Sequence, residues 1–424
     1  MAKSEYLTTI AIDTERSTFH FYSMIGNDRS TIAHHIKNYA GGHFDDDFFK
    51  KFKEAVKEFT ANTPSESFRK ITVVLPDSVV LADTIKVPTM RGLGQTKKTL
   101  GITLGGLYRN YSELQVVSHV AEQNKQYSTF AISAVQKRIV TSIYAACSEN
   151  KLLVDTLTFA SSAAIGGATM INPKLKNGSY LFLDLKDTYA RFVFVANGKT
   201  VGFYTLPFGL EFLRKDKVTQ EDMLFDHSYA ELSVLNARER AKSKKLTIMA
   251  LDADTEEADE DIELEDEPLE AQADENAMDE ESVEEEAEDT EEMEETGNTI
   301  PVRPQPSLKL FTRKSPRKLP KFMQREIPET SEGILYENFR VFVKWALTLI
   351  HSNEKLTELG KPAFVCVNIP SDLEGVLEMV NAEAEENGIT FTHLPYESTD
   401  TVVSANLELF GGLFPKQISS TSKF

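Results

Sequence analysis

Residues 6–24 read YLTTIAIDTERSTFHFYSM, and this stretch decides the fold. Its first half is an apolar β run that ends in an acid, Asp13. Its second half, residues 17–24, alternates apolar and polar side chains, which is typical of a half-buried strand. The stretch therefore predicts a β-hairpin whose turn comes directly after Asp13.

The same order of features returns later in the chain. Residues 180–184, YLFLD, form an apolar run that again ends in an acid, Asp184, and residues 189–195, YARFVFV, supply the second strand. An Asn197-Gly198 pair, a strong hairpin-turn signal, then leads to a third strand over residues 200–206. Two such units predict a duplicated α/β domain with a cleft between its halves.

The remaining periodic segments fit an α/β protein. Helices are predicted over residues 45–59, 136–150, 161–169, 220–245, 332–351 and 373–387, and strands over residues 71–75, 78–87, 128–134, 154–159, 363–369 and 391–395. The glycine-rich residues 101–106, GITLGG, lack the Lys-Ser/Thr ending of a phosphate-binding loop. They predict a packed turn.

The negative charge of the chain is concentrated in one segment. The 424 residues carry a net charge of −20, and residues 252–295 hold 26 Asp and Glu with no Lys or Arg. The excess of acidic over basic residues in the whole chain argues against a general nucleic-acid binder, which needs a basic face. The segment has no apolar period, so we predict disorder over residues 249–328, which include a basic, proline-containing stretch at 303–325. The acidic part is a solubilising segment, or an arm that engages the basic stretch or a basic partner.

Enzyme and metal motifs are not found in the sequence. Cys147 and Cys366 lie too far apart for a zinc motif, and the eight histidines form no i, i+4 metal pair. There is neither a nucleophile elbow nor an apolar run long enough for a secretory signal or a membrane span. We predict a protein of the cytoplasm, with no catalytic residue and no metal ligand.

Several motifs, taken in their order and spacing, resemble the PilM family, the actin-like proteins of type IV pilus assembly, which are related to the cell-division protein FtsA. Ala11-Ile12-Asp13 resembles the first phosphate hairpin of that family. Leu183-Asp184, Asn197-Gly198 and the LPFG of residues 206–209 resemble its second hairpin and the short motif after that hairpin. Residues 73–78 (VVLPDS) with 85–88 (IKVP) resemble a v-P-d-s … i-x-l-P stretch of that family. Residues 130–134 with the following helix and residues 154–160 resemble its inserted small subdomain, and residues 405–413 resemble its closing helix.

This resemblance covers roughly residues 5–245 and 330–415. It implies an actin-like, two-lobed α/β fold with a small inserted α/β subdomain and a disordered acidic insertion. The boundaries it implies are 1–67 for the N-terminal part of the first lobe, 68–160 for the inserted subdomain, 161–248 for the rest of the first lobe and the start of the second, 249–328 for the insertion, 329–415 for the rest of the second lobe and 416–424 for a flexible tail.

By the same resemblance, a vestigial nucleotide cleft is lined by Asp13, Thr14, Ser17, Asp184, Leu185, Lys186, Asp187 and Thr188. In actin-like ATPases a Gly comes after the hairpin Asp, so that backbone N–H groups can hold phosphate while the Asp positions a metal-bound water. Thr14 and Leu185 stand in place of these glycines, and a Cβ there obstructs the phosphate. His20 replaces a frequent Lys, and residues 370–375 lack the Gly-Gly pair that holds adenosine. We predict a pseudo-ATPase without a cofactor, with ATP and magnesium disfavoured.

The function implied by the resemblance is a scaffold of a type IV pilus or related machine, held at the inner face of the membrane by a partner. That partner is the cytoplasmic N-terminal peptide of a PilN-like single-span membrane protein, lying between the first lobe and the inserted subdomain along the strand edges of residues 78–87 and 128–134. Self-association stays open.

Two alternative functions remain. One is an FtsA-like protein that polymerises under the membrane, against which the polar residues 415–424 count. The other is an active ATPase of the same superfamily, against which the missing glycines count.

Overall fold

The computed structural model describes residues 6–14, 16–25, 33–39, 44–62, 70–108, 110–206, 208–215, 330–352, 362, 364–384, 388–395, 405–418 and 423–424. The helix predicted over residues 220–245 and the insertion predicted over residues 249–328 lie outside these ranges.

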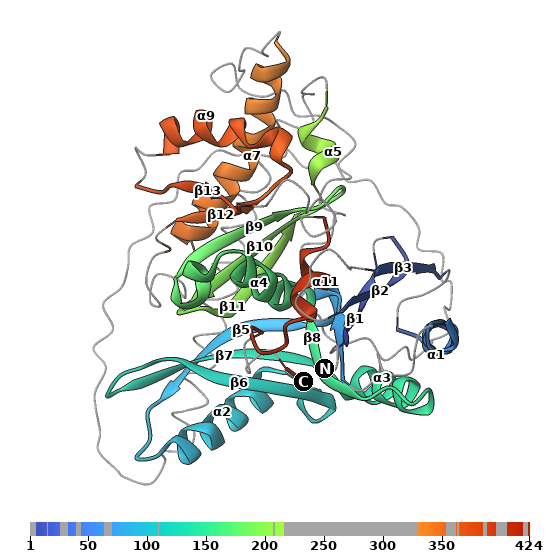
Figure 1. Cartoon of the computed structure of the whole chain (residues 1–424). Helices are drawn as coiled ribbons and strands as arrows, with labels where there is room; N and C mark the ends of the chain where they lie inside the picture. Colours follow the sequence, from blue (N-terminus) through green and yellow to red (C-terminus); the bar gives the residue numbers. More distant parts are fainter. Residues whose placement is uncertain are drawn as a thin grey trace, which may run out of the picture. The chain divides into compact units, whose positions relative to one another are not determined.

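The first lobe is built on a five-stranded sheet of order β3-β2-β1-β4-β8 (Figure 1). The strands are β1 (Tyr6–Asp13), β2 (Thr18–Ile25), β3 (Ala33–Asn38), β4 (Ile71–Leu75) and β8 (Val154–Phe159). β1, β2 and β3 pair antiparallel, whereas β4 is parallel to both β1 and β8. Helices α1 (Asp46–Asn62) and α3 (Lys137–Glu149) bury their apolar faces in the core on one side of this sheet, where Phe19 packs edge-on against Phe48 and Phe52.

The second lobe repeats this topology with a sheet of order β11-β10-β9-β12-β13. Its elements are β9 (Tyr180–Leu185), β10 (Ala190–Ala196), β11 (Lys199–Leu206), β12 (Val365–Asn368), β13 (Phe391–His393), α5 (Leu210–Leu213), α7 (Ser331–Ser352) and α9 (Gly375–Ala384). Again three antiparallel strands are followed by two parallel ones. Asn197 and Gly198 have φ of 51° and 70°, as the predicted tight turn requires. The duplication confirms the predicted actin-like α/β fold.

The inserted subdomain is a three-stranded antiparallel sheet covered by one helix. Its strands, in the order β5-β7-β6, are β5 (Leu81–Pro88), β7 (Tyr127–Gln136) and β6 (Leu114–Gln123), and the helix is α2 (Leu93–Leu107). The predicted range of 68–160 is therefore too wide, because β4 and β8 pair in the first sheet. The turn predicted over residues 101–106 is wrong, since these residues lie in α2 between the buried Leu100 and the end of the helix.

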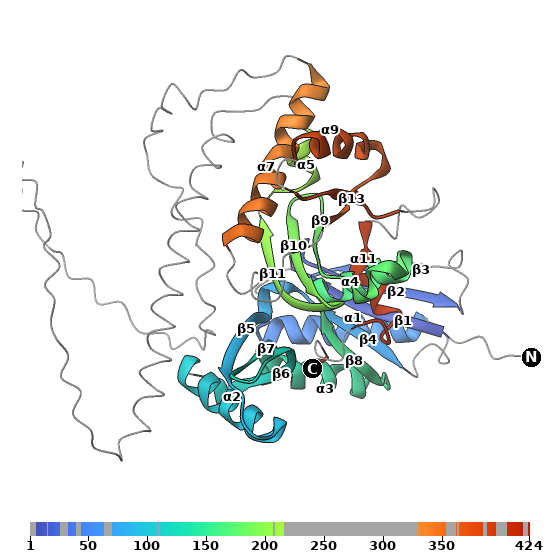
Figure 2. The ribbon, with the colours of Figure 1, turned by 90° about the vertical axis from the view of Figure 1, so that its left-hand side faces the viewer.

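Two helices, α4 (Ala160–Ile171) and α11 (Leu407–Gly412), share a core with both sheets (Figure 2). This core takes Ala11 and Tyr22 from the first sheet and Phe182 and Val193 from the second. The backbones of the two helices approach each other so closely that a Cβ at Gly411 would collide with the carbonyl oxygen of Ala163. The two lobes are thus joined through a common apolar seam.

Part of the predicted flexible tail is packed. Ile418 is 3% exposed, and the backbone N–H of Phe424 donates to the carbonyl oxygen of Leu157 at 2.8 Å. The prediction for residues 416–424 is wrong at these positions, because apolar side chains at the end of a polar run find places in the core. Among the described residues, the helices are too short or too polar to cross a bilayer.

Candidate functional site

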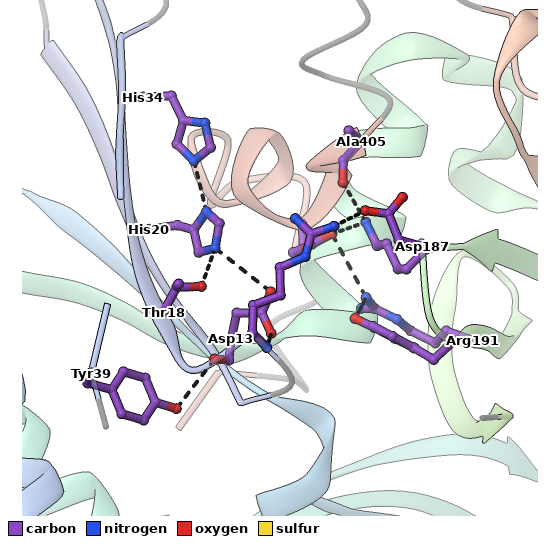
Figure 3. A network of polar contacts seen from close by, with 12 residues as sticks. Asp13, Thr18, His20, His34, Tyr39, Asp187, Arg191 and Ala405 are labelled. Carbon is purple, nitrogen blue, oxygen red and sulfur yellow. Dashed lines mark hydrogen bonds and ion pairs between the residues drawn. The ribbon is translucent and has the colours of Figure 1, made fainter. Parts of the chain in front are cut away.

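An ion pair connects two hairpin turns: the turn between β1 and β2, which includes Thr14, Arg16 and Ser17, and the turn of residues 186–189 between β9 and β10. The guanidinium of Arg16 contacts the carboxylate of Asp187, which is labelled in Figure 3. Both side chains are about half exposed. The backbone N–H of Arg16 donates to Asp13 Oδ1 at 3.0 Å, which fixes the turn that carries the arginine. One exposed pair therefore joins the end of β1 to the end of β9.

A second connection runs from Lys186 to α11. Lys186 Nζ donates to Glu408 Oε2 at 2.7 Å and to the carbonyl oxygen of Ala405 at 3.1 Å. Asp184 Oδ2 lies 3.5 Å from the same nitrogen. Burial would raise the pKa of Glu408, but Lys186 and Arg191 outweigh it and lower that pKa to about 2. Glu408 is therefore a carboxylate held charged by two cations.

Arg191 is the largest fully buried side chain of the described residues. It stands opposite Asp184 in the β9–β10 ladder, with Nη2 3.4 Å from Asp184 Oδ2 and Nε 3.4 Å from Asp77 Oδ2. Burial would lower the pKa of this guanidinium, but Tyr189 and the carboxylates of Asp77, Asp184 and Glu408 raise it above its ordinary value. We call Asp77, Asp184, Lys186, Arg191 and Glu408 the charged network.

Two further side chains fix the acids of the charged network. Asn368 Nδ2 donates to Asp184 Oδ1 at 2.6 Å, so β12 helps to hold that carboxylate. Asp77 accepts hydrogen bonds of 2.8 Å from the N–H and the hydroxyl of Ser161 at the start of α4. Burial raises the pKa of Asp77, although Arg191 and Ser161 oppose this shift. The network thus connects the end of β4, the start of α4, the second sheet and α11.

Histidines line the first-lobe side of the site. His20 Nε2 is hydrogen-bonded to Thr18 Oγ1 at 2.7 Å and lies 3.8 Å from Asp13 Oδ2, while His20 Nδ1 is hydrogen-bonded to His34 Nε2 at 2.8 Å (Figure 3). Burial lowers the pKa of both rings, in His34 to about 4. His20, which stands where a Lys was expected by resemblance, is therefore neutral near pH 7.

The structure brings most of the predicted cleft residues to the two hairpin ends. Asp13, Thr14 and Ser17 lie at the first turn, and Asp184 and Lys186 belong to the charged network, whereas Asp187 and Thr188 are exposed on the second turn.

Leu185 does not lie in the cleft. Its side chain is 4% exposed and packs in the core of the second lobe with Ala190 and Phe192, because β9 continues one residue past Asp184 and alternation turns Leu185 to the opposite face. The prediction that Leu185 obstructs a phosphate is wrong in its physical reason.

Sequence reasoning missed Arg16, Asp77, Arg191 and Glu408. Arg191 left a signal, since an arginine inside the apolar run YARFVFV needs a buried counter-charge. Glu408 left none, because its partner Lys186 is 222 positions away. Among the described residues no three His, Cys, Asp or Glu side chains gather to hold a metal. Because the cations of the network already face carboxylates, the arrangement joins the lobes electrostatically.

No family model and no curated protein matches the chain. Among solved structures, it is similar to a PilM–PilN type IV pilus biogenesis complex, with 11% identity, a TM-score of 0.48 and coverage of 98% of this chain and 99% of the other. It is also similar to the cytoplasmic domain of EpsL, an inner-membrane component of the type II secretion system of Vibrio cholerae (10% identity, TM-score 0.33, 48% and 71% covered). A third is the ethanolamine utilization protein EutJ from Carboxydothermus hydrogenoformans (10%, 0.32, 96% and 89%). The likeness concerns the fold, and the family that the sequence resembles is among these structures.

Proposed function

We propose that this chain is an actin-like scaffold of a type IV pilus or related assembly machine, and that it does not turn over nucleotide. The observation that supports this most is the double connection between the hairpins. Arg16–Asp187 and the charged network lie at the ends of the two hairpins that, by the resemblance, correspond to the phosphate hairpins of actin-like ATPases. A phosphate drawn to Lys186 and Arg191 has to displace Glu408, so binding of nucleotide competes with an internal anion.

Calorimetry with ATP and magnesium tests the nucleotide part of the proposal. We expect no binding tighter than roughly 100 µM, about −5.5 kcal/mol. Glu408→Ala removes the internal anion and leaves Lys186 and Arg191 as they are, so it is the matched variant in which weak binding of ATP should increase. Micromolar affinity of the unaltered chain would instead favour the active-ATPase alternative.

The partner in this proposal is the cytoplasmic N-terminal peptide of a PilN-like single-span membrane protein, which holds the scaffold at the inner face of the membrane. β7, which contains residues 128–134, is paired on both sides and offers no edge. Among the described strands β6 pairs only with β7, while β5 contacts β11 of the second lobe. β6 begins beside α3, where Lys137 Nζ donates to the carbonyl oxygen of Ser112 at 2.5 Å. We therefore place the peptide along β6, where main-chain hydrogen bonds supply affinity.

Titration of synthetic PilN-like N-terminal peptides against the full chain tests this placement. Val117→Glu puts a charge on the middle of β6, next to the added strand, and should weaken binding about tenfold or more. Leu153→Glu is the matched control, because Leu153 is also apolar and is 60% exposed, but lies just before β8. Equal weakening by both variants, or no peptide binding below roughly 100 µM, contradicts the placement.

A further inference from the structure

The inserted subdomain ends in a tip where exposed apolar side chains gather. Met90, Leu93 and Tyr127 are 45%, 50% and 44% exposed. They come from the residues after β5, the start of α2 and the start of β7, which meet at one end of the three-stranded sheet (Figure 1). Pro88 is paired with Tyr127, and the N–H of Thr89 donates to the carbonyl oxygen of Gln126 at 2.8 Å.

The same tip is positively charged. Lys86, Arg91, Lys97 and Lys125 are exposed there, and Glu122 is the acid exposed beside them. Residues 84–112 hold five basic residues and no acidic one. Lys97 comes one helical turn after Leu93, so cation and apolar side chain share a face of α2. We call Lys86, Met90, Arg91, Leu93, Lys97, Lys125 and Tyr127 the basic tip.

The backbone of the basic tip is held in place by hydrogen bonds. Asn124 Oδ1 accepts from the N–H groups of Gln126 and Tyr127 at 2.9 and 2.7 Å, which closes the β6–β7 turn. Thr96 Oγ1 accepts from the N–H of Met90 at 3.2 Å, which ties the residues before α2 to its first turn. The exposed side chains therefore stand on an ordered support, and little ordering is needed when they bind.

We propose that the basic tip binds the surface of an anionic lipid bilayer. Basic residues are attracted to anionic headgroups, and neighbouring apolar side chains enter the boundary between headgroups and acyl chains. A stable protein interface buries about 800 Å² on each partner, more than three side chains on one turn and one helix end supply, whereas a bilayer accepts a small convex tip. The proposal goes beyond the proposed function, in which only a peptide partner connects the chain to the membrane.

Flotation of the full chain with vesicles tests the proposal. Because the whole chain carries a net charge of −20, binding depends on the local charge of the tip. We expect the chain to float with vesicles of phosphatidylcholine and phosphatidylglycerol, and not with phosphatidylcholine alone. Binding should fall at about 1 M salt, where the Debye length is about 3 Å. Arg91→Gln with Lys97→Gln should lower partitioning about thirtyfold, at ~1 kcal/mol for each basic residue near the surface.

Matched variants separate the basic tip from general effects of charge and hydrophobicity. Met90→Ser with Leu93→Ser should lower partitioning about tenfold or more, because the apolar contact is lost. Lys70→Gln with Leu153→Ser removes one exposed cation and one exposed leucine next to β4 and β8, and should leave binding unchanged. Circular dichroism checks that all variants fold. Three outcomes would each overturn the proposal: equal binding to neutral and anionic vesicles, no binding to vesicles at all, or flotation of the tip variants like that of the unaltered chain. The peptide titration is independent of these outcomes.

Discussion

At the scale of single residues, the direction of its side chain makes Leu185 a core residue and not a residue of the cleft. It is buried among Ala190 and Phe192, so Leu185→Ala should leave a cavity and lower the free energy of unfolding by about 3 kcal/mol. Thr14→Ala, at the partly exposed first turn, should change it by about 0.5 kcal/mol or less. Urea denaturation measures both. Similar small effects would show that Leu185 is not a core residue.

Glu408 is the residue whose loss should disturb the charged network most. Glu408→Gln leaves Lys186 and Arg191 with less buried counter-charge, and we expect a loss of about 3 kcal/mol in the free energy of unfolding. Glu58→Gln breaks a pair with Lys37 in which both side chains are about half exposed, so it is the control and should cost about 0.5 kcal/mol or less. Chemical denaturation at pH 7 distinguishes the two.

A comparison of the unaltered chain with Glu408→Gln at different pH values gives a further prediction. The pKa of Glu408 in the folded chain is about 2, below its ordinary value of 4.5, so the folded state binds fewer protons than the unfolded state between these values. The stability contributed by Glu408 is therefore present above pH 4.5 and is lost as the pH falls toward 2. The difference in unfolding free energy between the unaltered chain and Glu408→Gln should shrink over this window. A constant difference contradicts the assignment.

At the scale of elements, the crossing of α4 and α11 depends on glycine. Gly411→Ala would drive a Cβ into the carbonyl oxygen of Ala163, so the helices must separate, and we expect a loss of about 2 kcal/mol or more. Gly106→Ala in α2 is the opposite case, since its Cβ meets nothing within 4 Å. It should stabilise the protein by about 0.5–1 kcal/mol through helix propensity. Thermal and urea unfolding of both variants check the contrast in sign.

Which elements could be predicted depended on local patterns. The two hairpins are encoded by apolar runs that end in Asp13 and Asp184, and the Asn197-Gly198 turn by glycine at positive φ. α2 was missed because its four glycines are typical of a turn, and only tertiary burial of Leu100 and Leu104 makes it a helix. β3 was missed because an edge strand of sequence AHHIKN has little apolar content.

The candidate site was predictable only in part, for a different reason. Asp13 and Lys186 stand where their hairpins end, and the resemblance of these hairpins to the phosphate hairpins of the PilM family selected them. Arg16–Asp187 and Lys186–Glu408 join residues 171 and 222 positions apart, and no local pattern encodes such pairs. Leu185 was misassigned because β9 continues one residue past Asp184, and successive side chains of a strand point to opposite faces of the sheet.

At the scale of the whole molecule, the second lobe is assembled across a long stretch of chain. Phe192 of β10 and Phe339 of α7 share one core although residues 216–329 separate the segments described around them. Because residues 252–295 have no apolar period, deletion of residues 250–300 should shift the melting temperature by only about 2 °C or less. Phe339→Ala, at a fully buried position, is the control that should lower it clearly. A large shift after the deletion would assign that segment to a core.

The position of α11 in the shared seam also shapes how the protein is made. During translation, β1 and β9 leave the ribosome long before α11 (Leu407–Gly412). Ala11 and Phe182 therefore emerge without the helix that later covers them in the shared core. Until residue 413 has emerged, that apolar surface is open to chaperones and to other nascent chains. Production of intact protein should therefore depend on chaperone supply far more than its final stability would suggest.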